Sequence, residues 1–348
     1  MPAVRLSDVA KDAGVSLATA SRVLNGSARV PGKAVAERVE ASAAKLGYVP
    51  NAQAQALARS RSGLIGLVVH DIADPYFATI AREVQQQVFA SQSQVLLTQT
   101  DRMIETEVRA LRSLIAQQVD ALVLVGSHRY GNESDTSISA LLGGFARNGG
   151  RVVGLGQSLG VGRTIVPDNA KAAHELATSL VVEGHRRFAV VEGIAGIPSA
   201  GDRTGGFIAA LTEAGIEPEL NVQAGLTREG GHLLAQQIAE HLAGRPEEEL
   251  PLCVFAPADV MALGALGELR RRGLDVPGRV AVAGFGGVPD GADAHPALTT
   301  IALPLHDMAR QAVDWVLEAP TDDAHPTTEV HVRGDVLLRE STALSARA

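Results

Sequence analysis

The chain of 348 residues has one cysteine, Cys253, and only 3% of its residues are aromatic. A single cysteine excludes an internal disulfide and a zinc site built from cysteines. No apolar run approaches the roughly 20 residues that a membrane-spanning helix needs, and the first residues lack the apolar core of a signal peptide. We therefore expect a soluble, cytoplasmic protein.

The sequence contains no recognisable arrangement of catalytic residues. The ten histidines show no metal-ligand spacing, and no serine lies in a nucleophile elbow. The glycines of 154–160 resemble a dinucleotide-binding loop, but extended sequence follows at 161–167, where that loop requires a helix. We interpret 154–160 as a crossover loop and Asp259 as a helix cap, and we expect no enzymatic activity, no metal and no cofactor.

The charge is distributed unevenly along the chain. The net charge is −8, which taken whole disfavours binding to nucleic acid. Residues 1–62 nevertheless carry nine Lys and Arg against four acids, a net charge of +5, and the remainder has a net charge of −13. This asymmetry points to a polyanionic partner for the first segment alone, with a chance fluctuation over a short segment as the alternative.

Residues 6–25 have the pattern of a helix-turn-helix. Apolar residues recur at helical spacing, Gly14 permits a tight turn, and Ser16 is placed to cap a second helix that runs to Leu24. A third helix is predicted over 33–46 and ends at Gly47. The segment 51–60 permits a helix but has almost no apolar face, so a flexible linker is its alternative interpretation.

The second of these helices carries side chains suited to reading DNA. Leu17 and Ala18 are placed to meet thymine methyl groups, and Arg22 can donate two hydrogen bonds to guanine. Short polar side chains suited to phosphate oxygens are those of Ser16, Thr19, Ser21 and Asn25. A generic helical hairpin would explain the apolar spacing, but not the positive charge.

From residue 63 onward, buried-strand patterns alternate with amphipathic helices. Such alternation predicts parallel βαβ units, and the length exceeds what one sheet accommodates, so we expect two α/β subdomains. The strands are predicted at 64–69, 94–98, 121–125, 152–155, 187–191, 252–255 and 280–283.

The order of these motifs resembles the LacI/GalR family of bacterial transcriptional regulators. Residues 5–59 resemble the DNA-binding head and hinge of that family, and the similarity continues over essentially the whole chain, in the motifs at 65–69, 71–77, 166–169, 184–185, 203–207, 259–264, 298–301 and 338–342. The resemblance implies an α/β core of two similar parallel-sheet subdomains, like a periplasmic binding protein, preceded by a small all-α helix-turn-helix head. The implied domains are the head 1–50, the hinge 51–62, an N-terminal core subdomain of 63–160 plus 290–320, and a C-terminal one of 161–289 plus 321–342.

The resemblance also implies a function. Members are ligand-responsive regulators, more commonly repressors, that bind a pseudo-palindromic operator as homodimers in the nucleoid and hold a small-molecule effector between the core subdomains, which controls DNA binding allosterically. Leu57 stands where the family's hinge leucine wedges into the minor groove. The implied DNA contacts are Leu6, Ser16, Leu17, Ala18, Thr19, Ser21, Arg22, Asn25, Arg29, Tyr48, Asn51, Ala54 and Leu57. The alternatives are a metabolite-binding core controlled mainly by a protein co-regulator, with a head of minor importance, and an α/β enzyme.

The implied effector cleft departs from the pattern of the sugar-binding members. Arg203 matches their arginine, but the turn that carries their aspartate reads as glycine and phenylalanine over 284–287, Ala258 replaces an asparagine, and Leu226 replaces an aromatic residue. Lost polar partners weaken sugar binding, so we expect an effector other than a simple hexose or pentose bound in the usual way. The candidate effector contacts are Phe77, Ser127, Gln157, Ser199 and Arg203, with core packing and loop hydrogen bonding as alternative roles for the phenylalanine and the serines.

Overall fold

The computed structural model describes residues 4–24, 31–49, 61–127, 133–192, 197–245, 250–318 and 327–344. Contacts divide the chain into two compact units, Met1–Gly63, which we call the head, and Leu64–Ala348, which we call the core. Each unit is described by itself. Within the described ranges, no helix is long and apolar enough to cross a membrane.

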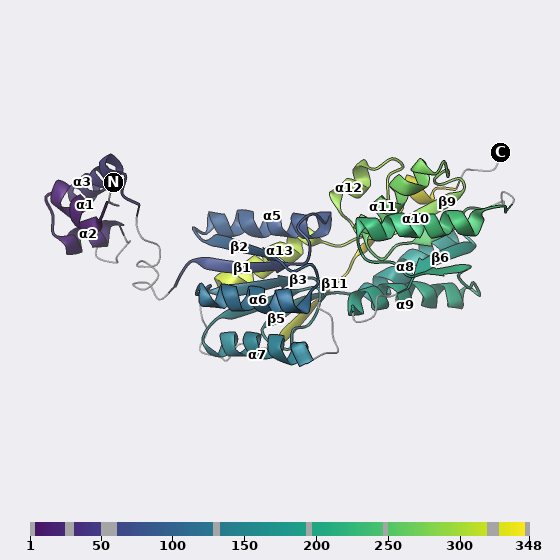
Figure 1. Ribbon diagram of the computed structural model, residues 1–348, viewed down its shortest axis with the longest axis horizontal. Coiled ribbons are helices and arrows are strands. Elements are labelled where there is room, and N and C mark those ends of the chain that lie inside the picture. Colours follow the sequence, from purple (N-terminus) through teal and green to yellow (C-terminus); the bar gives the residue numbers. More distant parts are fainter. Residues whose placement is uncertain are drawn as a thin grey trace. The chain divides into compact units, whose positions relative to one another are not determined.

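The head consists of helices α1 (Leu6–Asp12), α2 (Leu17–Leu24) and α3 (Lys33–Leu46), in the predicted order (Figure 1). The predicted cap of α2 is confirmed, because the Ser16 hydroxyl accepts a hydrogen bond from the backbone N–H of Thr19 at 3.1 Å. This bond satisfies one of the donors that the first turn of a helix leaves unpaired.

Small apolar residues hold the three helices of the head together. Val9 and Ala10 of α1, Ala20 of α2, and Val39 and Ala43 of α3 are all buried in one cluster. A unit of this size buries little apolar surface, so each of these contacts carries a large share of its stability.

The first sheet of the core has the strand order β11-β5-β4-β3-β1-β2 and is parallel throughout. Its strands are β1 (Leu64–Val69), β2 (Gln94–Gln99), β3 (Ala121–Val125), β4 (Arg151–Leu155), β5 (Arg163–Pro167) and β11 (Thr328–Val332). One face is covered by α5 (Pro75–Ala90) and α13 (Leu305–Leu317), and the other by α6 (Ile104–Ala116) and α7 (Glu133–Arg147) (Figure 1).

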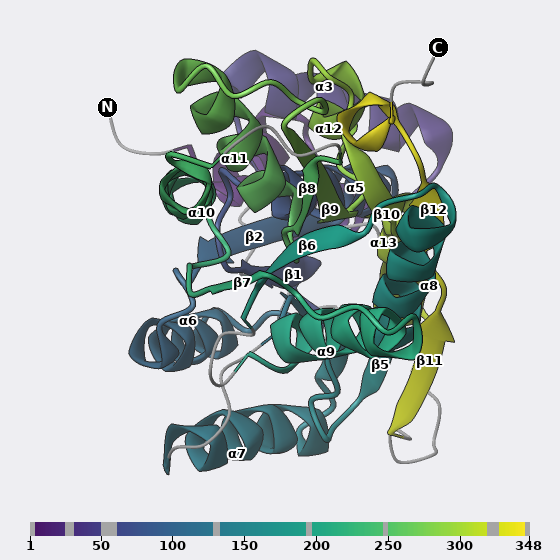
Figure 2. The same ribbon diagram turned by 90° about the vertical axis from the view of Figure 1, so that its right-hand side faces the viewer.

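The second sheet has the strand order β12-β10-β9-β8-β6-β7 and is parallel except for β12, which runs antiparallel to β10. Its strands are β6 (Arg187–Val191), β7 (Leu220–Val222), β8 (Leu252–Phe255), β9 (Val280–Gly286), β10 (Thr299–Ala302) and β12 (Asp335–Leu337). Figure 2 shows α8 (Asn169–Val182) and α9 (Pro198–Glu213) on one side of this sheet, and α10 (Arg228–Leu242) and α11 (Asp259–Arg271) on the other. The short helix α12 (Pro289–Asp293) follows β9, and a 3-10 turn, Glu340–Thr342, is the last element of the described residues.

The predicted fold class is therefore confirmed as a small helical head and two parallel-sheet α/β subdomains. The seven predicted strands are present, and β9 continues to Gly286, beyond the predicted end at 283. β5 lies within 161–167, which was predicted to be extended but was not counted as a strand, and β7, β10, β11 and β12 were not predicted. β7 and β12 have three residues, β10 has four and β11 is mostly exposed, so no long apolar run reveals these four strands.

The three crossings between the subdomains differ from the predicted positions. β5 pairs with β4, so the loop 156–162, which includes most of the predicted crossover loop 154–160, joins two strands of one sheet, and the first crossing falls at 168, not near 160. β10 pairs with β9, which moves the second crossing from near 290 to 303–304. β11 pairs with β5 and β12 with β10, which moves the third from near 320 to 333–334. Sheet membership depends on pairing between distant segments, and local periodicity does not report such pairing.

Candidate functional site

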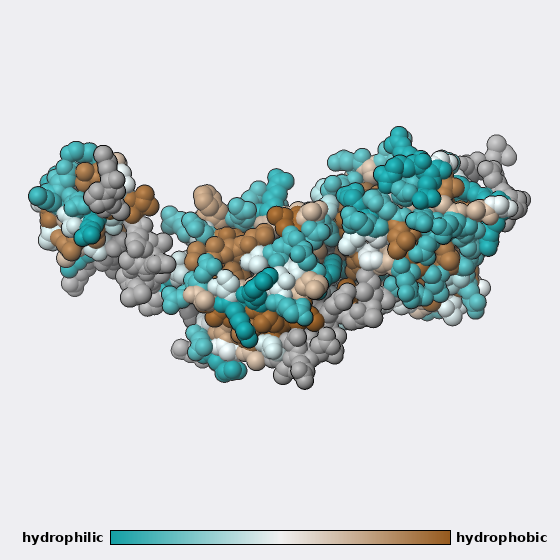
Figure 3. Space-filling view, viewed as in Figure 1, coloured by the Kyte–Doolittle hydropathy of each residue, from teal (hydrophilic) through white to brown (hydrophobic). Residues whose placement is uncertain are grey.

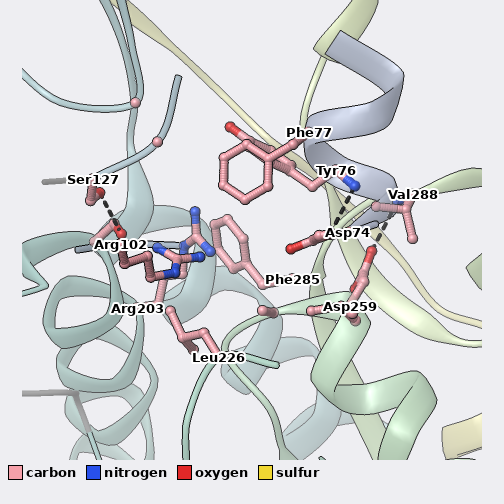
Figure 4. Close-up of a pocket in the computed structure, with 15 residues that line it drawn as sticks. Asp74, Tyr76, Phe77, Arg102, Ser127, Arg203, Leu226, Asp259, Phe285 and Val288 are labelled. Carbon is pink, nitrogen blue, oxygen red and sulfur yellow. Dashed lines mark hydrogen bonds between the residues drawn. The ribbon is translucent and has the colours of Figure 1, made fainter. Parts of the chain in front are cut away.

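The carboxyl ends of strands from both sheets meet around one pocket (Figure 4). The pocket contains about 540 Å³ of space that no atom of the protein occupies, a volume that includes space open to solvent. Its lining residues are Asp74, Tyr76, Phe77, Arg102, Gly126, Ser127, Gly156, Ser199, Arg203, Leu226, Ala258, Asp259, Val260, Phe285 and Val288. Ligands of parallel α/β folds bind at such strand ends, so this pocket is the candidate ligand site.

The structure brings four of the five candidate effector contacts to this pocket. Phe77, Ser127, Ser199 and Arg203 line it. Gln157 is buried in the loop after β4 but does not line the pocket, which is bordered there by its neighbour Gly156.

Arg203 of α9 is held by neutral partners. Its Nε donates to the side-chain oxygen of Asn169 at 2.8 Å, and its Nη1 donates to the carbonyl of Pro257 at 2.9 Å. The guanidinium carbon lies 4.1 Å from the centre of the Phe285 ring, which is within the range of a cation–π interaction. Burial lowers the pKa of Arg203 to about 10, so the group is a partly desolvated cation.

Asp259 does not have the predicted capping role. It is the first residue of α11, and its carboxylate instead accepts hydrogen bonds from the backbone N–H groups of Gly287 at 2.6 Å and Val288 at 2.9 Å, and from the Thr300 hydroxyl at 2.6 Å. The carboxylate turns to these donors because the loop after β9 presents two N–H groups beside the start of α11. Burial raises the pKa of Asp259 even though these donors favour its charged form.

The segment after β1 supplies a second buried carboxyl and two rings. Asp74 caps α5 by accepting a hydrogen bond from the backbone N–H of Tyr76 at 2.9 Å, and burial raises the pKa of Asp74 to about 6. Tyr76 and Phe77 pack edge to face, with ring centres 5.2 Å apart. The guanidinium carbon of Arg102, in the loop after β2, lies 5.7 Å from the Phe77 ring centre.

A hydrogen bond between two serines joins the subdomains at the pocket. The Ser127 hydroxyl, after β3, donates to the Ser199 hydroxyl of α9 at 2.7 Å. The carbonyl of Ser127 is in turn 3.0 Å from Nε2 of the buried His70, whose Nδ1 is 3.0 Å from the Thr100 hydroxyl. Ser127 is therefore fixed by the first subdomain and contacts the second.

The sequence interpretation did not select several lining residues as ligand contacts. Asp74, Tyr76 and Arg102 each follow a strand of the first sheet within seven residues. The rule that ligands bind at the carboxyl ends of parallel strands would have found them. Leu226, Ala258 and Phe285, noted as departures from a sugar site, also line the pocket.

The head presents part of its predicted DNA-contacting set on the surface of α2. Leu17, Ala18 and Arg22 are exposed, with Leu17 at 54% of its maximum. The Ser16 and Thr19 hydroxyls lie 2.8 Å apart, and Ser21 is half-buried. Leu6 and Tyr48 are half-buried against the head cluster. The remaining predicted contacts lie outside the described residues: Asn25, Arg29, Asn51, Ala54 and Leu57.

Nothing in the described part of the chain resembles a metal centre. No group of three or more His, Cys, Asp or Glu side chains in the described ranges could hold a metal ion. The two candidate sites are the exposed face of α2 and the pocket between the sheets.

A helix-turn-helix head joined to two parallel-sheet subdomains around a pocket defines a transcriptional regulator with a ligand-binding core. Comparisons with known families agree with this class. Residues 5–51 match the family described as bacterial regulatory proteins, lacI family, and residues 177–342 match the periplasmic binding protein-like domain.

The full-length relatives show the particular family. The HTH-type transcriptional repressor PurR of Erwinia tasmaniensis is 31% identical over 97% of this chain and 96% of its own length. The HTH-type transcriptional repressor CytR of Escherichia coli K12 is 31% identical over 91% of this chain and 89% of its own. A crystal structure of the lac repressor dimer, bound to operator and the anti-inducer ONPF, superposes with a TM-score of 0.81 at 25% identity, covering 98% of this chain and all of that one. The protein belongs to the lacI family of DNA-binding bacterial transcriptional regulators.

Proposed function

We propose that the protein is a ligand-responsive repressor that binds a pseudo-palindromic operator as a homodimer and responds to a small molecule in the pocket of the core. The observation that carries this proposal is the exposed face of α2, a capped helix with Leu17 and Ala18 in its first turn and Arg22 in its last. In helix-turn-helix proteins, the second helix lies in the major groove and contacts base edges there.

The chemistry of this face suits specific recognition. Arg22 can donate two hydrogen bonds to guanine, and Leu17 and Ala18 offer apolar contact to thymine methyl groups. The Leu17 side chain is 54% exposed. Contact with a thymine methyl group would remove part of this apolar surface from water, which favours binding.

A homodimer would use an apolar part of the core surface. Figure 3 shows apolar side chains gathered between α5 and α6, where the edge strand β2 lies. Exposed large side chains in and beside β2 are Ile72, Leu97 and Met103, at 52%, 41% and 55%. An exposed edge strand with apolar neighbours tends to associate with other chains, and a second copy of the protein would cover it.

The pocket is placed to transmit a signal. Its lining residues come from both subdomains, so a bound ligand changes the orientation of one subdomain relative to the other. We propose that this change reaches the head through the hinge segment 51–62. A coupling free energy of about 1–3 kcal/mol is typical of such control. The missing loop carboxylates favour an effector other than a simple hexose or pentose. No contact among the described residues specifically favours a protein co-regulator instead.

The test is retention of the protein's own promoter DNA by the purified full-length chain. Arg22→Ala should weaken specific binding by about 5- to 150-fold and leave binding to random DNA nearly unchanged. The matched control is Arg38→Ala, which removes an exposed charge from α3 and should not lower the preference for the promoter. The proposal is abandoned if neither added salt nor Arg22→Ala alters retention.

A further inference from the structure

We propose that the effector is a small organic anion, a carboxylate or a phosphate ester, whose acidic group binds between Arg203 and Arg102 and whose apolar part lies against Phe77 and Phe285. This inference rests on the proposed function, because it takes the pocket as the effector site. Figure 4 shows both guanidinium groups in the middle of the pocket, beside the Phe285 ring.

The hydrogen-bond inventory of Arg203 is incomplete without such a ligand. A guanidinium group has five N–H donors. Two of them donate to the neutral oxygens of Asn169 and Pro257, and the other three have no acceptor among the described residues. No carboxylate of the described chain lies within 4.0 Å of the group either. Arg203 is half-buried, and a partly desolvated cation with spare donors is stabilised most by an anion that accepts two parallel hydrogen bonds.

The acidic side chains of the pocket do not meet this need. Asp259 is 2% exposed, and its two oxygens already accept three hydrogen bonds from within the second subdomain. Asp74 uses one oxygen to cap α5. A sugar requires acceptors for its hydroxyl protons as well as donors, whereas the three spare donors of Arg203 exceed the one oxygen that the cap leaves to Asp74.

The apolar walls of the pocket strengthen the attraction between its arginines and an anionic ligand. Phe77, Leu226, Phe285 and Val288 are all at least 94% buried. Coulombic interactions are stronger beside such apolar walls than in water. The Ser127 and Ser199 hydroxyls are bonded to each other, whereas Arg203 keeps three N–H donors that no described residue accepts.

The placement of the two arginines links binding to the state of the core. Arg102 follows β2 of the first subdomain, and Arg203 lies on α9 of the second. Arg102 is among the groups that lower the pKa of Arg203, after burial, which is the effect of a like charge nearby. An anion between them replaces repulsion by attraction across the pocket and so favours the closed arrangement of the subdomains.

The experiment compares matched acids and neutral molecules on the purified full-length chain by thermal shift and titration calorimetry. The probes are benzoate with benzamide, phenyl phosphate with phenol, and glucose 6-phosphate with glucose. At least one acid should raise the Tm and bind at least tenfold more tightly than its neutral partner. The responding pair shows whether the site prefers a carboxylate or a phosphate.

Variants locate the effect. Arg203→Gln and Arg102→Gln should each weaken the responding acid at least tenfold, whereas Arg310→Gln, which removes an exposed arginine of α13, should not. Because Arg203 is packed in the core, circular dichroism checks its folding, and the loop variant Arg102→Gln keeps the test valid if Arg203→Gln unfolds. Neutral partners that bind as tightly as the acids, or a panel in which no acid binds, overturn the inference.

Promoter retention in the same preparations separates the two proposals. A chain that retains its promoter DNA and binds only neutral probes refutes the anionic effector and leaves the regulator intact. A chain that binds an acid but retains no promoter DNA refutes the proposed function instead.

Discussion

Replacing Asp74 by asparagine should stabilise the folded protein at neutral pH and above. The Asp74 side chain is 7% exposed, and one of its oxygens caps α5 through the backbone N–H of Tyr76. Asparagine caps helices about as well as aspartate does, so Asp74→Asn keeps the capping oxygen and removes only the charge. That charge is unfavourable in the fold, because burial raises the pKa of Asp74 to about 6.

The size of the gain follows from the pKa. A rise from 3.8 to about 6 corresponds to about 3 kcal/mol. The folded protein holds this proton more tightly than the unfolded chain does, so the wild-type free energy of unfolding falls as the pH rises from about 4 to above 6. Asp74→Asn has no proton to lose, so its advantage is about 3 kcal/mol at pH 8 and only about 1 kcal/mol at pH 4.5.

Urea unfolding followed by circular dichroism at these two pH values measures the effect. The control is Asp290→Asn, because Asp290 is an exposed acid in the first turn of α12 and its replacement should change stability little at either pH. A variant no more stable than the wild type at pH 8, or one with the same gain at both pH values, would falsify the reasoning. The first result would mean that the buried charge costs nothing, and the second that the gain comes from packing.

Three further changes test the remaining contacts. Val39→Ala, at a fully buried position of the head, should cost the head about 2 kcal/mol, and unchanged hydrogen exchange of the head amides would contradict this. Asp259→Ala leaves two buried backbone donors without their acceptor and should lower the free energy of unfolding of the core by about 2–5 kcal/mol. Urea unfolding measures this loss, and a variant as stable as the wild type would show that Asp259 does not stabilise the loop after β9. Ser199→Ala removes the bond to Ser127, worth about 1 kcal/mol, so small-angle scattering should show a more open core; an unchanged radius of gyration would show that the bond does not hold the subdomains together.

Local patterns predicted the parts of the fold that are determined locally. The helix over 33–46 and the strand at 121–125 have the predicted bounds, because their apolar spacing directly reflects the face that they bury. The strands β10, β11 and β12 were not predicted, because short or exposed strands are fixed by their partners in the sheet and not by their own residues. The predicted crossings failed for the same reason.

In the candidate site, too, local sequence predicts some roles, whereas others depend on segments that are distant in the chain. Arg203 was predicted to contact a ligand, through its place in a family pattern. Asp259 was assigned to a cap from its position before a helix, whereas its partners lie 28 and more residues further along the chain. The roles of such side chains depend on which loops the two sheets bring together, and spacing along the sequence carries no signal for this.

The last strands of the chain have a consequence for how the protein is made. β11 completes the edge of one sheet and β12 the edge of the other, and only residues 333–334 separate them. On the ribosome, the head can fold early because its helices are close in sequence. The first sheet is complete only when residue 332 has emerged, and the second only when residue 337 has emerged. A premature stop before β11 therefore damages both halves of the core at once, and the core cannot be cut into two contiguous pieces that each fold to their native sheets.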